Sequence, residues 1–156
     1  VKAGDNRVIS GDILTGQHID ADGALGFYHT TVTVIEEGKE QEFLGWMMPG
    51  LNKFSASKTF LSWLSPSKKY NLDTNMHGEE RAYVMTGEYE KVLPMDIYPT
   101  HLIKACMIED VELMENLGIY EVSPEDLALC EFVCTSKIEV QSIIRQGLDL
   151  VRKENS

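Results

Sequence analysis

The sequence has few cysteines, few histidines and few basic residues, and it has no long apolar run. Its 156 residues include 3 cysteines and 4 histidines, and 14 basic residues against 25 acidic ones give a net charge of −11. So few cysteines, in an odd number, exclude a disulfide scaffold and fit a reducing compartment. No apolar run approaches the roughly 20 residues that span a membrane. A surface this acidic repels phosphate backbones, so we expect no nucleic-acid partner.

The common catalytic motifs are also missing. There is no Gly-x-Ser-x-Gly, no P-loop and no His-Glu-x-x-His. The chain begins with Val1 rather than methionine and has no apolar signal region, so we expect a piece of a longer protein. Hydrophobic residues make up 43% and charged residues 25%, which is typical of a globular domain.

The first half of the chain has the composition of β-structure. Residues 7–14 form a short apolar stretch, and residues 30–35 are rich in β-branched side chains and precede a glutamate-rich turn. Residues 42–47 form a third such run, and residues 54–64 fit either a fourth strand or a short helix. The polar residues 65–78 are the best candidate for a linker.

The second half has the signals of short helices. Pro99 can open a helix, because its missing N–H is one that the first turn leaves unpaired anyway. Ser123 and Asp126 fit a helix N-terminus, and Ser136 with Glu139 fits a capping box before a one-sided apolar pattern. We therefore expect a small bundle of four short helices.

The cysteines leave several interpretations open. Cys130 and Cys134 lie four apart on an expected helix, where nearly parallel side chains disfavour a disulfide. A zinc site has only Cys106 and either His101 or His77 as further candidates, with no Cys-x-x-Cys pair. An iron–sulfur cluster needs four thiolates, one more than the chain contains. The simplest interpretation is three buried thiols that pack as small apolar groups.

Several blocks of the sequence resemble one protein family in the same order. Residues 87–97 (GEYEKVLPMDI) and 125–134 (EDLALCEFVC) are similar to the A subunit of the bacterial sodium-translocating NADH:quinone reductase. The resemblance spans nearly the whole chain and corresponds to the C-terminal third of that protein. The upstream blocks that share it are residues 43–46, 49–50, 53–55 and 77–82.

The resemblance implies an α+β fold with two parts. Residues 1–64 resemble the soluble-ligand-binding β-grasp (SLBB-type) region of that family. Residues 65–78 would be the linker, and residues 79–156 would form a helical, ferredoxin-like domain that has lost its clusters.

The resemblance also accounts for the cysteines. The family is related to the C subunit of the Rnf electron-transfer complex, which carries two motifs of the form C-x₂-C-x₂-C-x₃-C-P. Threonine and tyrosine are poor substitutes for thiolate on iron, and leucine and proline cannot coordinate it. The resemblance therefore implies neither a cluster nor a metal or catalytic residue here. Laid on this chain, the two motifs fall on Tyr83, Thr86, Tyr89, Leu93, Pro124, Leu127, Cys130 and Cys134.

The function implied by the resemblance belongs to a complex. Such a complex oxidises NADH, reduces ubiquinone and exports sodium across the bacterial inner membrane, with flavins and iron–sulfur centres on other subunits. This chain would be peripheral, on the cytoplasmic side, and would reach the membrane only through partner subunits. We expect it to have no turnover and no cofactor of its own, to dock to other subunits and to contribute to quinone binding. One alternative is a pure scaffold without any ligand, and another is that the thiols hold a metal or cluster after all.

Overall fold

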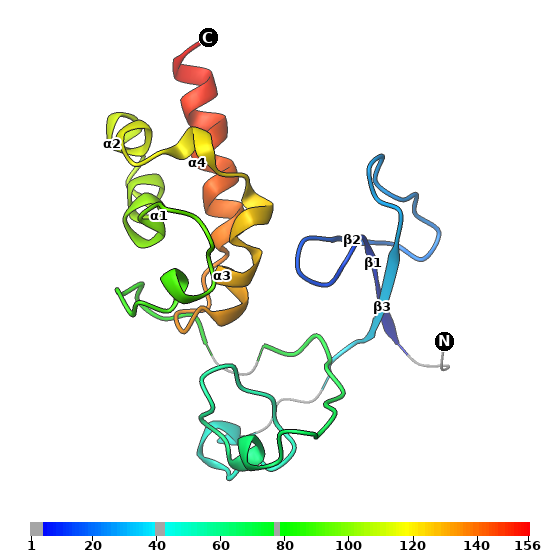
Figure 1. Cartoon of the computed structure of the whole chain (residues 1–156). Helices are drawn as coiled ribbons and strands as arrows, with labels where there is room; N and C mark the ends of the chain where they lie inside the picture. Colours follow the sequence, from blue (N-terminus) through cyan, green and yellow to red (C-terminus); the bar gives the residue numbers. More distant parts are fainter. Residues whose placement is uncertain (1–4, 40–42, 77–78) are drawn as a thin grey trace. The chain divides into compact units, whose positions relative to one another are not determined.

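The chain has two compact units, which we describe separately. A computed structural model describes residues 5–39, 43–76 and 79–156 (Figure 1). The units are Val1–Glu79 and Glu80–Ser156. In the described residues the first contains a three-stranded sheet and the second contains four α-helices, so the composition is α+β as expected. The β-grasp and ferredoxin-like assignments, and the linker over residues 65–78, stay predictions.

The sheet of the first unit is antiparallel, with the earliest strand in its centre. Strand β1 (Asn6–Ser10) pairs with β2 (Gln17–Ile19) on one side and with β3 (Val32–Glu36) on the other. The β-branched run expected at residues 30–35 therefore forms an edge strand. The apolar stretch at residues 7–14 is a strand only as far as Ser10, because the Asp12 carboxylate accepts hydrogen bonds from the N–H groups of Leu14 and Thr15 and bends the chain.

The prediction of a strand at residues 42–47 is wrong for residues 43–47, which the structure describes. Leu44 has a left-handed backbone with φ 52°, and Gly45–Met47 form a short 3₁₀ helix, η1. The Gly45 carbonyl bonds to the Lys53 ammonium group at 2.9 Å instead of joining a sheet. For residues 54–64, which fit either a strand or a short helix, the helix alternative holds at the end of the run, because Leu61–Leu64 form the 3₁₀ helix η2. Glu42 lies outside the described residues.

The second unit is built from α1 (Pro99–Met107), α2 (Val111–Asn116), α3 (Ala128–Val133) and α4 (Val140–Glu154). Helix α4 packs against the other three helices. No helix in the described part of the chain has the length and hydropathy needed to cross a membrane. The core comprises Tyr89, Leu93, Leu102, Ile103, Ala105, Cys106, Met114, Ile119, Val122, Leu127, Cys130, Cys134, Val140, Ile144 and Val151.

Two of the three expected helix starts are confirmed. Pro99 is the first residue of α1. The Asp126 carboxylate accepts hydrogen bonds from the N–H and the hydroxyl of Ser123 at 2.8 and 3.0 Å, at the start of the 3₁₀ helix η5 (Pro124–Leu127), which leads into α3. The capping box at Ser136 is wrong, because the Ser136 hydroxyl is buried and donates to the Ala82 carbonyl at 3.1 Å.

The start of α4 is satisfied from a neighbouring helix. The Glu131 carboxylate of α3 accepts a hydrogen bond from the Gln141 N–H at 2.9 Å. A carboxylate at this position pairs a free N–H of the first turn and opposes the positive end of the helix dipole. The sequence pattern near Ser136 identified the correct helix but not the residue that caps it.

Candidate functional site

The eight positions on which the resemblance places the two cluster motifs gather mainly in the core of the second unit. Six of the eight are buried, Tyr83 is half-buried and Thr86 is exposed. Helix α3 ends at Val133, so Cys134 follows the helix rather than lying on it as we expected. The six buried positions are Tyr89, Leu93, Pro124, Leu127, Cys130 and Cys134.

The first group of positions consists of the first three positions of the first motif, Tyr83, Thr86 and Tyr89, together with the last position of the second motif, Cys134. In two-cluster ferredoxins the fourth cysteine of one motif ligates the cluster held by the other motif. Here the fourth position of the second motif, Cys134, accepts a buried hydrogen bond from the Tyr89 hydroxyl at 3.0 Å. The ring of Tyr83 stacks on the ring of Tyr89, with centroids 6.0 Å apart. Thr86, the remaining position of this group, does not take part.

The tyrosines of this group are held neutral. Burial raises the pKa of Tyr83 to about 12, and the nearby hydroxyls of Thr100 and Tyr89 offset part of the rise. Burial, and then its bond to Cys134, raise the pKa of Tyr89 above its ordinary value. The Tyr83 hydroxyl is buried without a hydrogen-bond partner among the described residues. The Lys104 ammonium group lies 5.8 Å from the centre of the Tyr83 ring.

The second group consists of the other four motif positions and is almost entirely apolar. Leu93, Pro124, Leu127 and Cys130 are all buried, and Leu127 and Cys130 are fully so. Burial raises the pKa of the Cys130 thiol to about 11, and the nearby Glu90 carboxylate adds to the rise. The thiolate, which is the form that binds metals, is therefore rare at neutral pH.

These residues do not fit an iron–sulfur cluster. The donor set has two sulfurs among eight positions, and they belong to different groups. All three cysteines of the chain are free and buried, as the simplest interpretation predicted. In the part of the chain that the structure describes, no three His, Cys, Asp or Glu side chains are grouped to hold a metal ion. His77, one candidate zinc ligand, lies outside the described residues.

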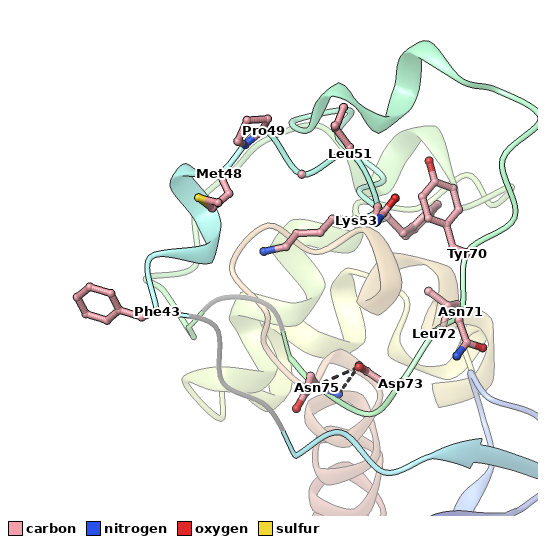
Figure 2. A pocket seen from close by; sticks show the side chains of 13 residues that line it. Phe43, Met48, Pro49, Leu51, Lys53, Tyr70, Asn71, Leu72, Asp73 and Asn75 are labelled. Carbon is pink, nitrogen blue, oxygen red and sulfur yellow. Dashed lines mark hydrogen bonds between the residues drawn. The ribbon is translucent and has the colours of Figure 1, made fainter. Parts of the chain in front are cut away.

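A second candidate site, which the sequence did not predict, lies in the first unit. Residues of two separate loop segments, 43–54 and 70–75, line an open pocket with a volume of about 840 Å³. This volume is within the range of about 300–1,000 Å³ that is typical of small-molecule sites. In Figure 2 the Lys53 side chain reaches across the space between Met48 and the Asp73–Asn75 segment, whereas the Phe43 ring points away from the other labelled side chains.

Hydrogen bonds hold the first segment of the pocket in place. The Ser62 hydroxyl donates to the Lys53 carbonyl at 2.5 Å, and the Lys68 ammonium group donates to the Leu51 carbonyl at 2.6 Å. Gly50 has φ +62°, and a Cβ atom there would lie 2.3 Å from the Phe60 ring, so only glycine fits.

The second segment is attached to the sheet. Asp73 forms a parallel bridge with Glu36 of β3. The Thr74 hydroxyl donates to the Glu37 carboxylate at 3.0 Å and accepts from the Gly38 N–H at 2.8 Å. Arg7 of β1 binds Glu37 in turn, and its guanidinium lowers the pKa of that carboxyl. A short network of polar contacts therefore connects the second segment of the pocket to the sheet.

The described lining of the pocket includes apolar and aromatic side chains and is nearly neutral in charge. Phe54 and Tyr70 contact each other edge to face, with ring centroids 5.6 Å apart. Among the described lining residues, Lys53 has the one positive charge and Asp73 the one negative charge. Lys53 donates to the Gly45 carbonyl and lies 5.5 Å from the centre of the Phe60 ring.

Comparisons with known proteins agree on one family. The chain is 47% identical over 98% of its length to the A subunit of the Na(+)-translocating NADH-quinone reductase of Shewanella denitrificans. It is 48% identical over 99% of its length to the corresponding protein of Pasteurella multocida, and 46% identical over 95% to that of Rhodopirellula baltica. No family model matches the chain.

The similarity covers only part of each relative. The chain spans about a third of their length (35%, 34% and 33%) and matches their C-terminal part. The blocks on which the sequence resemblance rested lie inside the aligned region, which includes nearly every residue of the chain. Over nearly its whole length, the chain is therefore a homologue of the C-terminal part of the A subunits of Na(+)-translocating NADH-quinone reductases.

Proposed function

We propose that this chain is a docking part of a sodium-translocating NADH:quinone reductase. The whole complex would couple NADH oxidation and ubiquinone reduction to sodium export; the name of the relatives gives NADH, a quinone and Na⁺ translocation. The chain would lie on the cytoplasmic side of the inner membrane as a peripheral component. It would contact the membrane only through partner subunits and would perform no turnover by itself.

The lack of a core among the described residues of the first unit is the observation that carries this proposal. Ile9 is the one buried apolar side chain among the described residues of Val1–Glu79, whereas Glu80–Ser156 contains a continuous core. Large apolar side chains of the first unit face solvent instead, and Phe27 and Tyr28 are 93% and 90% exposed. Apolar surface of this extent marks interaction sites, because burying it from water is favourable.

Leu25, Phe27 and Tyr28, which we call the apolar tip, are the clearest docking element. The tip follows β2 and includes no charged residue, and the Phe27 and Tyr28 rings contact each other edge to face at 4.9 Å. Such a tip is suited to an apolar groove of a neighbouring subunit. Coverage by another stretch of the same polypeptide is the competing possibility that the test must distinguish.

Co-purification of the assembled reductase tests the docking role. Replacing Phe27 and Tyr28 with serine removes the apolar tip, and we expect the yield of complex that contains this chain to fall by about tenfold. The matched control replaces Met107 and Ile108, two exposed apolar neighbours of the second unit, with serine and should leave the yield unchanged. Equal yields from both pairs, or crosslinks from the tip only to other residues of the same polypeptide, would overturn the proposal.

We expect the helical unit to carry no electrons. Its former ligand positions are occupied by packed tyrosine, leucine and proline side chains, which supply no further thiolate. A chain with a cluster would be brown when purified, absorb near 400 nm and contain iron. We expect a colourless, iron-free preparation, and iron at one equivalent or more with that absorbance would favour the metal-binding alternative.

Quinone binding is the second part of the proposed function, and the pocket is the observation that favours it. A saturable change in the NMR spectrum of the chain on addition of a ubiquinone analogue would support this role. A pure scaffold would show no such change at analogue concentrations up to its solubility limit.

A further inference from the structure

We infer that Ser10 and His29 hold the apolar tip in the conformation in which it docks. This inference rests on the proposed function, in which the tip enters an apolar groove of a neighbouring subunit. The tip lies in the loop between β2 and β3, and Phe27 and Tyr28 are almost fully exposed, so burial of their rings does not fix the loop. A loop that is ordered before it binds avoids the entropic cost of being ordered on binding. Contacts that order the tip in the free chain therefore strengthen docking.

One buried hydroxyl lies at both ends of the turn that presents the two rings. Ser10 is the last residue of β1 and is 1% exposed. Its Oγ accepts a hydrogen bond from the Gly26 N–H at 2.9 Å and lies 2.6 Å from Nδ1 of His29. The His29 N–H donates to the Gly26 carbonyl at 2.9 Å, which closes a turn around Phe27 and Tyr28. We call Ser10, Gly26 and His29 the tip anchor, because they fix the chain directly before and after the exposed rings.

The hydrogen bonds of the tip anchor determine which ring nitrogen of His29 has the proton. The Ser10 hydroxyl accepts from the Gly26 N–H, and among the described residues Nδ1 of His29 is the acceptor within reach of its own hydrogen. Nδ1 therefore accepts, and the proton of the neutral ring lies on Nε2. Since a buried hydroxyl without an acceptor is unfavourable, the tip anchor needs an acceptor at this position of residue 29.

The His29 ring is also held by its packing against two glycines. A Cβ atom on Gly26 would lie 2.9 Å from Nδ1 of His29, and one on Gly11 would lie 3.5 Å from Cε1. Gly11 directly follows β1, and its N–H donates to the Thr31 carbonyl at 2.9 Å. The ring thus lies against backbone of the loop and against backbone next to the strand, and this packing orients Nδ1 toward Ser10.

A serine and a histidine in contact also occur in catalytic sites, but this pair does not fit that role. A serine nucleophile must reach its substrate, and Ser10 is 1% exposed. Its hydroxyl oxygen is also occupied by the Gly26 N–H. We therefore assign Ser10 and His29 to positioning the tip and not to a reaction.

Amide hydrogen exchange of the 156-residue chain, followed by NMR, tests whether the anchor orders the tip. Ser10→Ala removes the acceptor of the Gly26 N–H, and we expect that amide to exchange about fivefold faster. His29→Leu should have a similar effect, whereas His29→Asn keeps an acceptor near the position of Nδ1 and should exchange slowly. Ser62→Ala is the matched control, because Ser62 is also a buried serine of the first unit and its hydroxyl bonds to the Lys53 carbonyl.

Three results in the free chain would overturn the inference. One is unchanged exchange of the Gly26 amide in Ser10→Ala and His29→Leu. The others are an equal acceleration in Ser62→Ala, which would indicate general loss of stability, and an equal acceleration in His29→Asn, which would show that the acceptor has no role. If Ser10→Ala does not fold, the two variants of His29 decide, because residue 29 lies outside the strands.

Co-purification of the reductase separates this inference from the proposed function. Ser10→Ala and His29→Leu should lower the yield of complex about threefold, while His29→Asn and Ser62→Ala keep the parental yield. If replacing Phe27 and Tyr28 lowers the yield but Ser10→Ala does not, docking stands and the tip anchor has no role in it. If replacing Phe27 and Tyr28 leaves the yield unchanged, docking itself is wrong and this inference is wrong with it.

Discussion

The buried tyrosine–cysteine contact is the most informative single interaction in the second unit. The resemblance places Tyr89 in the first cluster motif and Cys134 at the end of the second, and 45 positions separate them in the chain. Their hydrogen bond joins two segments that a shared cluster would join in a two-cluster ferredoxin. In this chain a hydrogen bond between a phenol and a thiol connects the two segments.

Removing the Tyr89 hydroxyl tests the strength of this contact. Tyr89→Phe should lower the free energy of unfolding by about 1 kcal/mol, because a buried hydrogen bond is lost. A double-mutant cycle with Cys134→Ala should give a coupling of at least about 0.5 kcal/mol. Tyr98→Phe, at a 70% exposed position, is the control and should be neutral in urea denaturation. Additive effects of the two single variants would contradict a direct interaction.

The three cysteines should be unreactive in the folded chain. All are buried, and burial raises the pKa of both Cys106 and Cys130 to about 11, so their thiolate form is rare at neutral pH. We expect less than about one equivalent of thiol to react with a disulfide reagent at about pH 7.5 within an hour, and all three thiols to react in denaturant. Rapid reaction of two or more thiols in the native chain would disagree with this packing.

At the scale of elements, α1 and α4 approach each other closely at Gly147, which leaves no room there for a larger side chain. A Cβ atom on Gly147 of α4 would lie 2.6 Å from the Cys106 Sγ and 3.3 Å from the Met114 Sδ. Glycine is therefore required in the middle of a long helix, although it is a poor helix former.

Gly147→Ala measures this contact. Helix propensity alone would stabilise the variant by about 1 kcal/mol, but the overlap with sulfur should cost about 2 kcal/mol, so we expect a net loss of about 1 kcal/mol. Combining it with Cys106→Ala should remove most of the loss. The exposed neighbour Gln146→Ala serves as the control in the same denaturation experiments. A Gly147→Ala variant more stable than the parent would show that the helices do not approach this closely.

Local signals predicted the elements of the second unit better than those of the first. Pro99 and Ser123 mark helix starts by chemistry within a few residues, and both predictions are confirmed. The run at residues 42–47 has the composition of a strand, but its described residues pair with no other strand. The Gly45 carbonyl of this run instead accepts a hydrogen bond from the Lys53 ammonium group. The pocket could not be predicted, because its two loop segments meet only through contacts that are distant in sequence.

At the scale of the whole molecule, the two units should differ in stability. The first buries one apolar side chain among its described residues and the second buries a continuous core, so the first has much less hydrophobic stabilisation. Both tryptophans, Trp46 and Trp63, belong to the first unit, whereas the α-helices of the described residues belong to the second. Tryptophan fluorescence and helical circular dichroism therefore report on different units.

Urea denaturation followed by both signals tests this difference. We expect the fluorescence midpoint at a urea concentration at least about 1 M below that of the circular dichroism at about 222 nm. Coincident midpoints would mean that the units unfold together and that the first has stabilisation from elsewhere in the chain.

Docking of the first unit in the reductase is the central claim, and hydroxyl-radical footprinting tests it most directly. The chain would be labelled alone and within the assembled complex, and side-chain oxidation would be compared residue by residue. We predict that Phe27 and Tyr28 are oxidised at least about fivefold more slowly in the complex, while the exposed Tyr98 and Ile108 of the second unit change by less than about twofold. Equal oxidation of Phe27 and Tyr28 in the free chain and the intact complex would contradict the account.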